Sequence, residues 1–356
     1  MLHPGPLVAA GAIEISVTQG VAAEIDEAAA GAVPEHAFLR ARWFAAGAGE
    51  AAPLTLVARR AGTGSVVAAL PLVTRAVGPL EVREVPGSYW PYRSFPISAD
   101  ASDEELAALL AAPQSRRALG RVWRLGPVHG DDPTASRLAA AGRRSGWTMV
   151  ARKVATCFEL DLARLSAAGG WPTSKRRQTL RARDRRLAAI GEISYSTVSG
   201  TGWSGDVLDT LAAIEAESWV VRDGGDPKFL AGTASRRGWE VVIADAELAG
   251  KLVCWFLHVG GEPAAFVFSL DAGPVRHVIA NSYSERFAEG SPGLLLLYRA
   301  FQDSIAAGVL KINWGAGDAG YKTQNGAEAG ADLLDLLFVR GPLLAAVAGP
   351  LWRRGG

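Results

Sequence analysis

The sequence predicts an α+β protein of two similar halves, each a twisted, mixed sheet flanked by helices. Two observations carry this prediction. Three adjacent segments of the second half have the strand residues and turn signals of an antiparallel meander: residues 252–259, 263–270 and 275–283. The hydrophobic period then changes to that of a helix over residues 292–308, and a short strand is expected at 310–314.

Turns and caps define the other elements of the second half. Gly260-Gly261 separates the first two meander strands as a two-residue hairpin loop. Ser174 is a candidate N-cap for a basic helix that Gly191 ends. The remaining expected elements are a strand at 192–198, helices at 205–219 and 227–238, a strand at 239–244, a short helix near Tyr321 and a last strand at 334–339.

The first half has a similar order of elements, so we expect two domains, residues 1–160 and 161–356. Its expected elements are a helix at 34–46, a hairpin of strands at 54–60 and 65–74, a helix at 103–112, a strand at 121–125, a helix at 134–145 and a strand at 149–160. No long Pro/Gly/Ser linker marks the boundary between the two halves.

The composition is that of a globular protein without general affinity for polyanions. Hydrophobic residues make up 49% of the 356 residues and charged residues 21%, which excludes a disordered or fibrous chain. The net charge is only +1, so DNA is not an expected partner and any anion site must be local. Two cysteines and five scattered histidines give neither a disulfide framework nor metal-ligand spacing, so we expect no metal.

No targeting or membrane-spanning segment is expected, and the expected location is the cytoplasm. Residues 1–6 lack the features of a signal peptide, and no segment reaches the ~20 apolar residues of a membrane span. The longest candidate, residues 343–352, is expected to be a packed segment. The alternative is an interfacial anchor, because Arg340, Arg353 and Arg354 flank it.

The most informative motif is Ser291-Pro292-Gly293-Leu294, which follows a strand and opens a helix. Ser291 suits the N-cap, and Pro292 suits the first helical position. Gly293 leaves room for a ligand to approach the backbone. The free N–H groups and partial positive charge of a helix start favour phosphate, so this segment is either an anion site or a plain helix start.

The order of meander, capped helix and strand resembles the GNAT acetyltransferases. Shorter motifs are similar to a tandem, CelD-like group of that superfamily, which is associated with cellulose and exopolysaccharide biosynthesis and is related to the FemAB peptidyltransferases. In the second half these are Lys175-Arg176-Arg177, Tyr283-Ser284-Glu285, Ser291-Pro292-Gly293, Gly308, Gly315-Ala316-Gly317-Asp318 and Tyr321-Lys322. In the first half they are Phe38-Leu39, Trp43, Leu70-Pro71-Leu72 and Pro86-Gly87.

The chain departs from the family pattern at two points. It carries Glu289-Gly290-Ser291-Pro292-Gly293 in place of the usual Arg/Gln-x-x-Gly-x-Gly/Ala loop. Asn313 stands where an Asp is expected before the glycine-rich turn, so that position has no carboxylate.

The resemblance implies two GNAT-like domains, with the donor site in the second. Its donor would be acyl-CoA or acetyl-CoA, and acyl carrier protein is the other candidate carrier. The pyrophosphate would bind at Ser291, Gly293 and Leu294, where the strand before this helix and the strand after it separate. Lys175 and Arg176 begin a helix with seven basic residues, either a landing surface for phosphates or a solvated face.

Acyl transfer to an amine needs a base, an acid and a group that stabilises the oxyanion. Asp318, Tyr321 and Lys322 could supply these functions, and a three-residue step would put Asp318 and Tyr321 on one helical face. Glu285 or His277 is the alternative base. The alternative for Asp318 is a capping role.

The expected acceptor is a small-molecule amine, such as an amino sugar, an amino acid or a polyamine. Glu215 and Trp219, four residues apart on an expected helix, are candidates for contacting it, with His277 and Tyr283. The expected function is therefore that of an N-acyltransferase. The alternatives are a FemAB-like transferase that uses aminoacyl-tRNA, and a non-catalytic accessory of polysaccharide assembly. The sequence does not set the oligomeric state.

Overall fold

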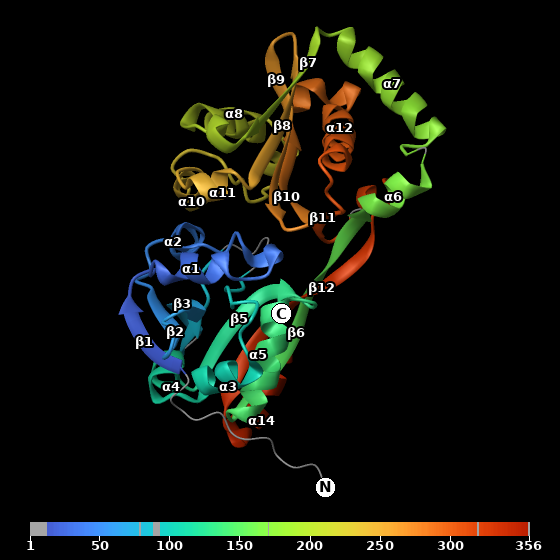
Figure 1. The fold of residues 1–356 in the computed structure, drawn as a ribbon. Helices are drawn as coiled ribbons and strands as arrows, with labels where there is room; N and C mark the ends of the chain where they lie inside the picture. The colour runs from blue at the N-terminus through green and yellow to red at the C-terminus, as the bar shows by residue number, and fades with distance from the viewer. Residues whose placement is uncertain (1–12, 78–79, 88–92, 170, 319, 355–356) are drawn as a thin grey trace. The chain divides into compact units, whose positions relative to one another are not determined.

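A computed structural model describes residues 13–77, 80–87, 93–169, 171–318 and 320–354 (Figure 1). Residues 1–6, expected not to form a signal peptide, lie outside this set. By its internal contacts the chain forms two compact units: unit 1 comprises residues 1–157 and 330–356, and unit 2 comprises residues 158–329. Each unit is described separately below.

Unit 2 contains the meander that the sequence predicts. Its strands follow the order β7-β8-β9-β10-β11, in which every pair is antiparallel except the parallel pair β10–β11. Gly260 and Gly261 both have positive φ between β8 and β9, which confirms the two-residue hairpin. The strands are β7 (Ile193–Ser199), β8 (Leu252–Val259), β9 (Glu262–Ala272), β10 (Val275–Tyr283) and β11 (Lys311–Ala316).

Helices cover both faces of the unit 2 sheet, with α12 on one face and α8, α10 and α11 on the other (Figure 1). Side chains of β9 therefore alternate between two cores: Val267 belongs to the cluster with α12, whereas Phe268 packs edge-on against Trp239 of α10. The helices are α6 (Leu162–Ala168), α7 (Ser174–Ala188), α8 (Gly205–Ala216), α9 (Trp219–Arg222), α10 (Ala234–Ile243), α11 (Ala246–Ala249), α12 (Pro292–Ala306) and α13 (Tyr321–Gln324).

The prediction of a strand at residues 239–244 is wrong, because this segment belongs to α10. Thr233 caps that helix by accepting a hydrogen bond from Arg236 N–H at 3.1 Å. Trp239 and Val242 are both buried, and their three-residue step places them on one helical face. The run Trp239–Ile243 is short and has no hydrophobic alternation. Its local sequence therefore fits the buried end of a helix as well as a strand.

The strands of unit 1 form mixed β-sheet in the order β1-β2-β3-β4-β5-β12-β6. Its pairs are antiparallel from β1 to β4 and between β5 and β12, and parallel between β4 and β5. The strands are β1 (Ile13–Gln19), β2 (Leu54–Arg60), β3 (Val66–Val77), β4 (Leu80–Glu84), β5 (Val122–His129), β6 (Trp147–Asp161) and β12 (Glu328–Arg340).

The helices of unit 1 flank this sheet, with α1 against β3 and α3 against α5. They are α1 (Glu24–Ala30), α2 (Ala41–Ala48), α3 (Asp103–Ala111), α4 (Pro113–Leu119), α5 (Pro133–Arg144) and α14 (Pro342–Arg354), with a 3₁₀ turn at Pro34–His36. The helix expected at 34–46 is thus this turn followed by α2. The predicted hairpin, β5, α5 and β6 are all present, whereas β1, α1, β4 and α4 were not anticipated.

The end of the chain returns to unit 1, although the sequence analysis assigned all of 161–356 to one domain. The reason is the pairing of β12 with β5, in which Trp123 stands opposite Phe338 with ring centroids 4.3 Å apart. Asp335 is fully buried and accepts charge-assisted hydrogen bonds from Arg124 Nε and Arg152 Nη2, both at 2.7 Å. These contacts tie β12 to two other strands of unit 1.

Among the described helices, none is long and apolar enough to cross a membrane. Residues 343–352, expected to pack, lie within α14. One side of that helix packs on Val150, Leu337 and Val339 through Leu344, Ala345, Ala348 and Trp352.

Candidate functional site

The candidate site of unit 2 begins where β10 and β11 stop pairing. Only three residue pairs join them, ending at His277 opposite Asn313, although β10 continues to Tyr283 and β11 to Ala316. A bulge between Val278 and Ala280 in the pairing of β10 with β9 bends β10 at the same level. The two strands therefore separate towards their carboxyl ends, which is the splayed arrangement that the sequence analysis expected.

The helix α12 starts beside the end of β10, and its first turn has unusual geometry. Ser291 is the one non-glycine residue of the described chain with positive φ, at 53°. It occupies the N-cap position, but its side chain accepts no capping bond; instead its carbonyl accepts from Leu294 and Leu295 N–H. Nothing within the described residues accepts a hydrogen bond from Gly293 N–H. This amide is a donor that an anion could use.

Gly293 also determines how Tyr283 packs. A Cβ atom at Gly293 would lie 3.1 Å from Tyr283 Cδ1, so a larger residue would push the ring away. The space that the sequence analysis reserved for a ligand at this glycine is thus partly filled by Tyr283. Burial raises the pKa of the Tyr283 phenol, and the charge of Glu285 adds to this shift.

The turn after β11 is fixed by two of the predicted catalytic residues. Asp318 Oδ1 accepts hydrogen bonds from Gly320 N–H at 2.8 Å and Lys322 N–H at 3.0 Å. Lys322 is buried, and its Nζ donates to the carbonyls of Gly315 and Ala316, each at 3.1 Å. The structure therefore gives both residues a role in shaping the turn, and their catalytic roles stay predictions.

Tyr321 is exposed, with 41% of its surface accessible. Its ring packs edge-on against Trp314 of β11, with centroids 5.4 Å apart. Burial of the phenol raises its pKa, and the nearby Asp318 charge raises it further. The expected shared helical face with Asp318 is wrong, because α13 begins only at Tyr321.

Two other candidates for a base differ in burial. His277 is almost fully buried, at the last position where β10 pairs with β11. Glu285 lies just after β10, is partly exposed and forms an ion pair of 3.0 Å with Arg222 at the end of α9. Glu285 therefore lies on the accessible side of the segment that joins β10 to α12.

The expected acceptor residues Glu215 and Trp219 do not share a helix. Glu215 belongs to α8, which ends at Ala216, whereas Trp219 begins α9 and is 43% exposed. Glu215 is buried, and its oxygens accept from the N–H groups of Lys228 and Phe229 at 2.8–3.0 Å. It fastens the loop before α10. Contact of either residue with an acceptor stays a prediction.

Of the two residues of α7 that were predicted to bind phosphate, Lys175 and Arg176, only Arg176 is held by contacts within the described chain. Arg176 Nη2 donates to the Gln324 carbonyl at 2.9 Å, and its guanidinium lies over the Tyr298 ring. Lys175 is exposed. Thr173, rather than Ser174, caps this helix, through a bond from Arg176 N–H.

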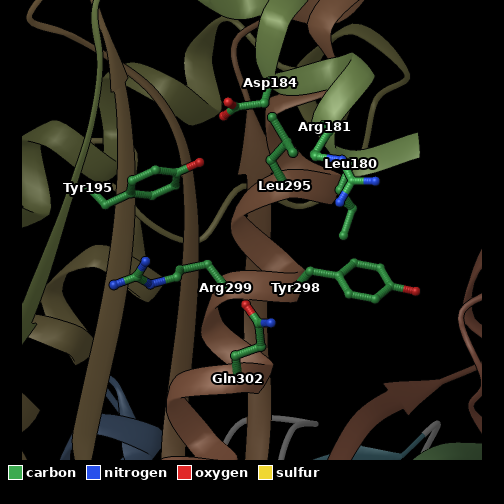
Figure 2. A pocket seen from close by; sticks show the side chains of 8 residues that line it. All are labelled: Leu180, Arg181, Asp184, Tyr195, Leu295, Tyr298, Arg299 and Gln302. Carbon is green, nitrogen blue, oxygen red and sulfur yellow. The ribbon is translucent and has the colours of Figure 1, made fainter. Parts of the chain in front are cut away.

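Unit 2 also has an open pocket of about 220 Å³ between α7, β7 and α12, which contains none of the predicted site residues. Figure 2 shows Tyr195 and Arg299 from one side and Arg181 and Asp184 of α7 from another. The Arg299 guanidinium lies 5.6 Å from the centre of the Tyr195 ring. The residues that line the pocket are Leu180, Arg181, Asp184, Tyr195, Leu295, Tyr298, Arg299 and Gln302.

Glu159, which no sequence motif indicated, lies beside the end of the β10–β11 pairing. Asn313 Nδ2 donates to Glu159 Oε1 at 3.3 Å, and Lys311 Nζ lies 2.9 Å from Glu159 Oε2. Asn313 Oδ1 also accepts from Gly315 N–H at 3.0 Å. A carboxylate is therefore present next to Asn313 but comes from β6, which no local motif indicated. Among the described residues, no group of three or more His, Cys, Asp or Glu is arranged to hold a metal.

Comparison with known proteins identifies similar folds. Residues 174–323 match the acetyltransferase (GNAT) domain family. The crystal structure of FemX is similar over 94% of this chain and 100% of that chain, with 10% identity and a TM-score of 0.63. The C-terminal domain of a putative lysylphosphatidylglycerol synthetase from Agrobacterium fabrum is similar over 91% of this chain and 93% of that chain, with 14% identity and a TM-score of 0.53. No curated protein matches the chain.

These findings confirm the predicted fold class, in which each of two units has a twisted mixed sheet flanked by helices, and the acetyltransferase (GNAT) match covers residues of unit 2 alone. A GNAT-like origin of unit 1 stays a prediction. At such low sequence identity the similar solved structures support the fold alone. The matched residues include the β10–β11 separation, the start of α12 and the turn at Asp318, so the candidate site lies in the part of the chain that matches the acetyltransferase domain family. Membership of the group associated with exopolysaccharide synthesis stays a prediction.

Glu215 makes the stability of unit 2 depend on pH. Burial raises the pKa of this carboxyl above its usual 4.5, although the two backbone N–H donors oppose the shift. The folded state thus holds the proton more tightly than the unfolded state. The associated stabilisation is complete below about pH 4.5 and is lost as pH rises through the raised pKa.

We expect Glu215→Gln to remove this decline, as measured by urea unfolding of the wild type and the variant at several pH values from 4 to 7. Glu289→Gln, at an exposed position of the same unit, serves as the control and should keep the wild-type profile. Parallel pH profiles of the wild type and Glu215→Gln would contradict the assignment.

Proposed function

We propose that the protein is an N-acyltransferase that moves an acyl group from a thioester, by default acyl-CoA, to a small-molecule amine in unit 2. The observation that carries this proposal is the separation of β10 and β11 after His277, beside a helix start whose Gly293 N–H has no acceptor among the described residues. The acetyltransferase domain match over residues 174–323 supports it.

In this proposal, the start of α12 binds the phosphates of the donor. Gly293 N–H and the positive end of the helix dipole both favour an anion there. The left-handed conformation of Ser291 supports this assignment, because strained non-glycine residues persist where the surrounding structure holds them and cluster at functional sites. Lys175 is a further cation for the donor, whereas Arg176 is already held by the Gln324 carbonyl.

The catalytic groups are proposed from exposure and hydrogen bonding. Tyr321 is exposed, and a tyrosine phenol is protonated at neutral pH, so this side chain can donate a proton to the departing thiolate. Glu285 is the proposed base, because it is accessible and its Arg222 partner is exposed. Asp318 and Lys322 hold the turn that carries Tyr321, so we propose them as positioning residues.

Donor binding is tested by isothermal titration calorimetry with coenzyme A, acetyl-CoA and a long-chain acyl-CoA. We expect binding to the wild type, and loss of binding in Gly293→Asp, because a carboxylate would face the phosphates. Gly205→Asp is a matched control: Gly205 opens α8 in the same unit, and an added Cβ there meets nothing within 4 Å. If Gly293→Asp melts at the wild-type temperature and still binds with wild-type affinity, the assigned site is incorrect.

The role of Tyr321 is tested by Tyr321→Phe. We expect kcat to fall by roughly 10²-fold or more with little change in donor affinity, since the acid acts in the chemical step. Tyr195→Phe removes a hydroxyl of similar exposure on β7 and should leave kcat unchanged. A kcat within twofold of wild type in Tyr321→Phe would exclude the phenol as the acid.

A second candidate is a FemAB-like transferase that takes its donor from aminoacyl-tRNA, favoured by the cations of α7. Lys175, Arg181, Arg185 and Arg186 are exposed on this helix, which has one acid, Asp184. This candidate predicts tRNA binding in a gel-shift assay that weakens steeply with salt and is lost when these four residues become Gln. Absence of tRNA binding at low salt removes it. If neither donor binds, a non-catalytic accessory role is the remaining reading.

A further inference from the structure

The outward face of α14 in unit 1 is apolar along its length. Leu343, Val347 and Leu351 are 85%, 63% and 66% exposed and follow one another at four-residue steps, so they form one stripe. Eight residues at 1.5 Å each give this stripe a length of about 12 Å. Pro342, Ala346 and Pro350 are exposed beside it.

This pattern is unusual for a helix at the surface of a domain. The opposite side of α14 is apolar as well, because Leu344, Ala345, Ala348 and Trp352 pack on unit 1. A surface helix normally turns charged or polar side chains outward, whereas a helix that is apolar on all sides is covered by something. In α14 the only charged side chains are Arg353 and Arg354, in its last turn.

The charges around the stripe all have one sign. Residues 336–354 contain Arg340, Arg353 and Arg354 but no Asp or Glu. Arg353 and Arg354 are exposed at the end of α14, while Arg340 precedes it with its guanidinium over the Trp147 ring. A partner of this surface must therefore offer an apolar layer and negative charge together.

We propose that α14 docks on the surface of an anionic lipid bilayer. Leu343, Val347 and Leu351 enter the boundary between headgroups and acyl chains, and the arginines at its two ends contact lipid phosphates. With 13 residues the helix is about 20 Å long, shorter than the ~30 Å hydrocarbon core, so it lies in the interface rather than across it.

A second copy of the chain fits this face less well. In a symmetric contact the same patch meets itself, so the basic ends of one α14 would face those of the other, with no acid in residues 336–354 to pair with them. A stripe of three side chains is also small compared with the ≈ 800 Å² per partner of a stable interface.

The test is flotation of the full chain with two kinds of vesicle. One contains phosphatidylcholine alone, and in the other about one lipid in three is the anionic phosphatidylglycerol. We expect binding to the anionic vesicles that weakens with salt, and at least about tenfold weaker binding of the double variant Leu343→Gln, Val347→Gln. Ile190→Gln with Leu310→Gln alters two aliphatic residues of unit 2 that are 54% and 52% exposed, and should bind like wild type. Arg353→Gln with Arg354→Gln should lower binding to anionic vesicles by about thirtyfold.

Three outcomes would overturn the proposal: no binding of the wild type to anionic vesicles, equal binding by the α14 variants, or a dimer in light scattering that the Leu343 and Val347 substitutions dissociate. The last result would make this face an interface between two copies of the chain. Because the assay contains no acyl donor, its result is independent of the proposed acyl transfer.

Discussion

The parallel pairing of β10 with β11 stops after three residue pairs, and the candidate site exists because of that. Beyond His277 and Asn313 the facing backbone groups of the two strands lose their ladder partners, and buried groups of this kind must find others. Side chains provide hydrogen-bond partners in this segment. Asn313 Oδ1 accepts a hydrogen bond from Gly315 N–H, and the Lys322 ammonium donates to the carbonyls of Gly315 and Ala316. These hydrogen bonds fix the turn that presents Tyr321.

The start of α12 follows from the same separation. β10 ends at Tyr283, whose ring rests against Gly293, and a Cβ atom at Gly293 would lie only 3.1 Å from that ring. Ser291 adopts a left-handed conformation between the 3₁₀ turn Glu285–Gly290 and the first helical residue, and its carbonyl accepts hydrogen bonds from the N–H groups of Leu294 and Leu295. The Gly293 N–H is then the donor at this helix start without an acceptor in the described chain. An amide without an acceptor, the start of a helix and two separating strands thus occur close together in the chain.

Unit 1 shows how a sheet can be completed by a distant segment. The pairing of β12 with β5 brings Asp335 between Arg124 and Arg152, and the buried carboxylate accepts from both guanidinium groups. α14 follows directly and packs one side on the same sheet, with Arg152 over the Trp352 ring at 4.4 Å. Its other side stays apolar and exposed. Among the described residues, only the inner face of α14 has packing partners.

The sequence by itself determined the elements whose signals are local. The Gly260-Gly261 hairpin, the helix that begins at Pro292 and the change of period after Tyr283 were all readable, because turns, caps and periodicity act within a few residues. Only the tertiary structure decided the rest, because contacts between distant strands leave no local pattern. It placed Glu159 of β6 beside Asn313, separated Glu215 from Trp219 into two helices, gave Asp318 and Lys322 to the turn and returned residues 330–356 to unit 1. The GNAT-like order of elements was therefore legible in the chain, whereas the atoms that surround the candidate site were not.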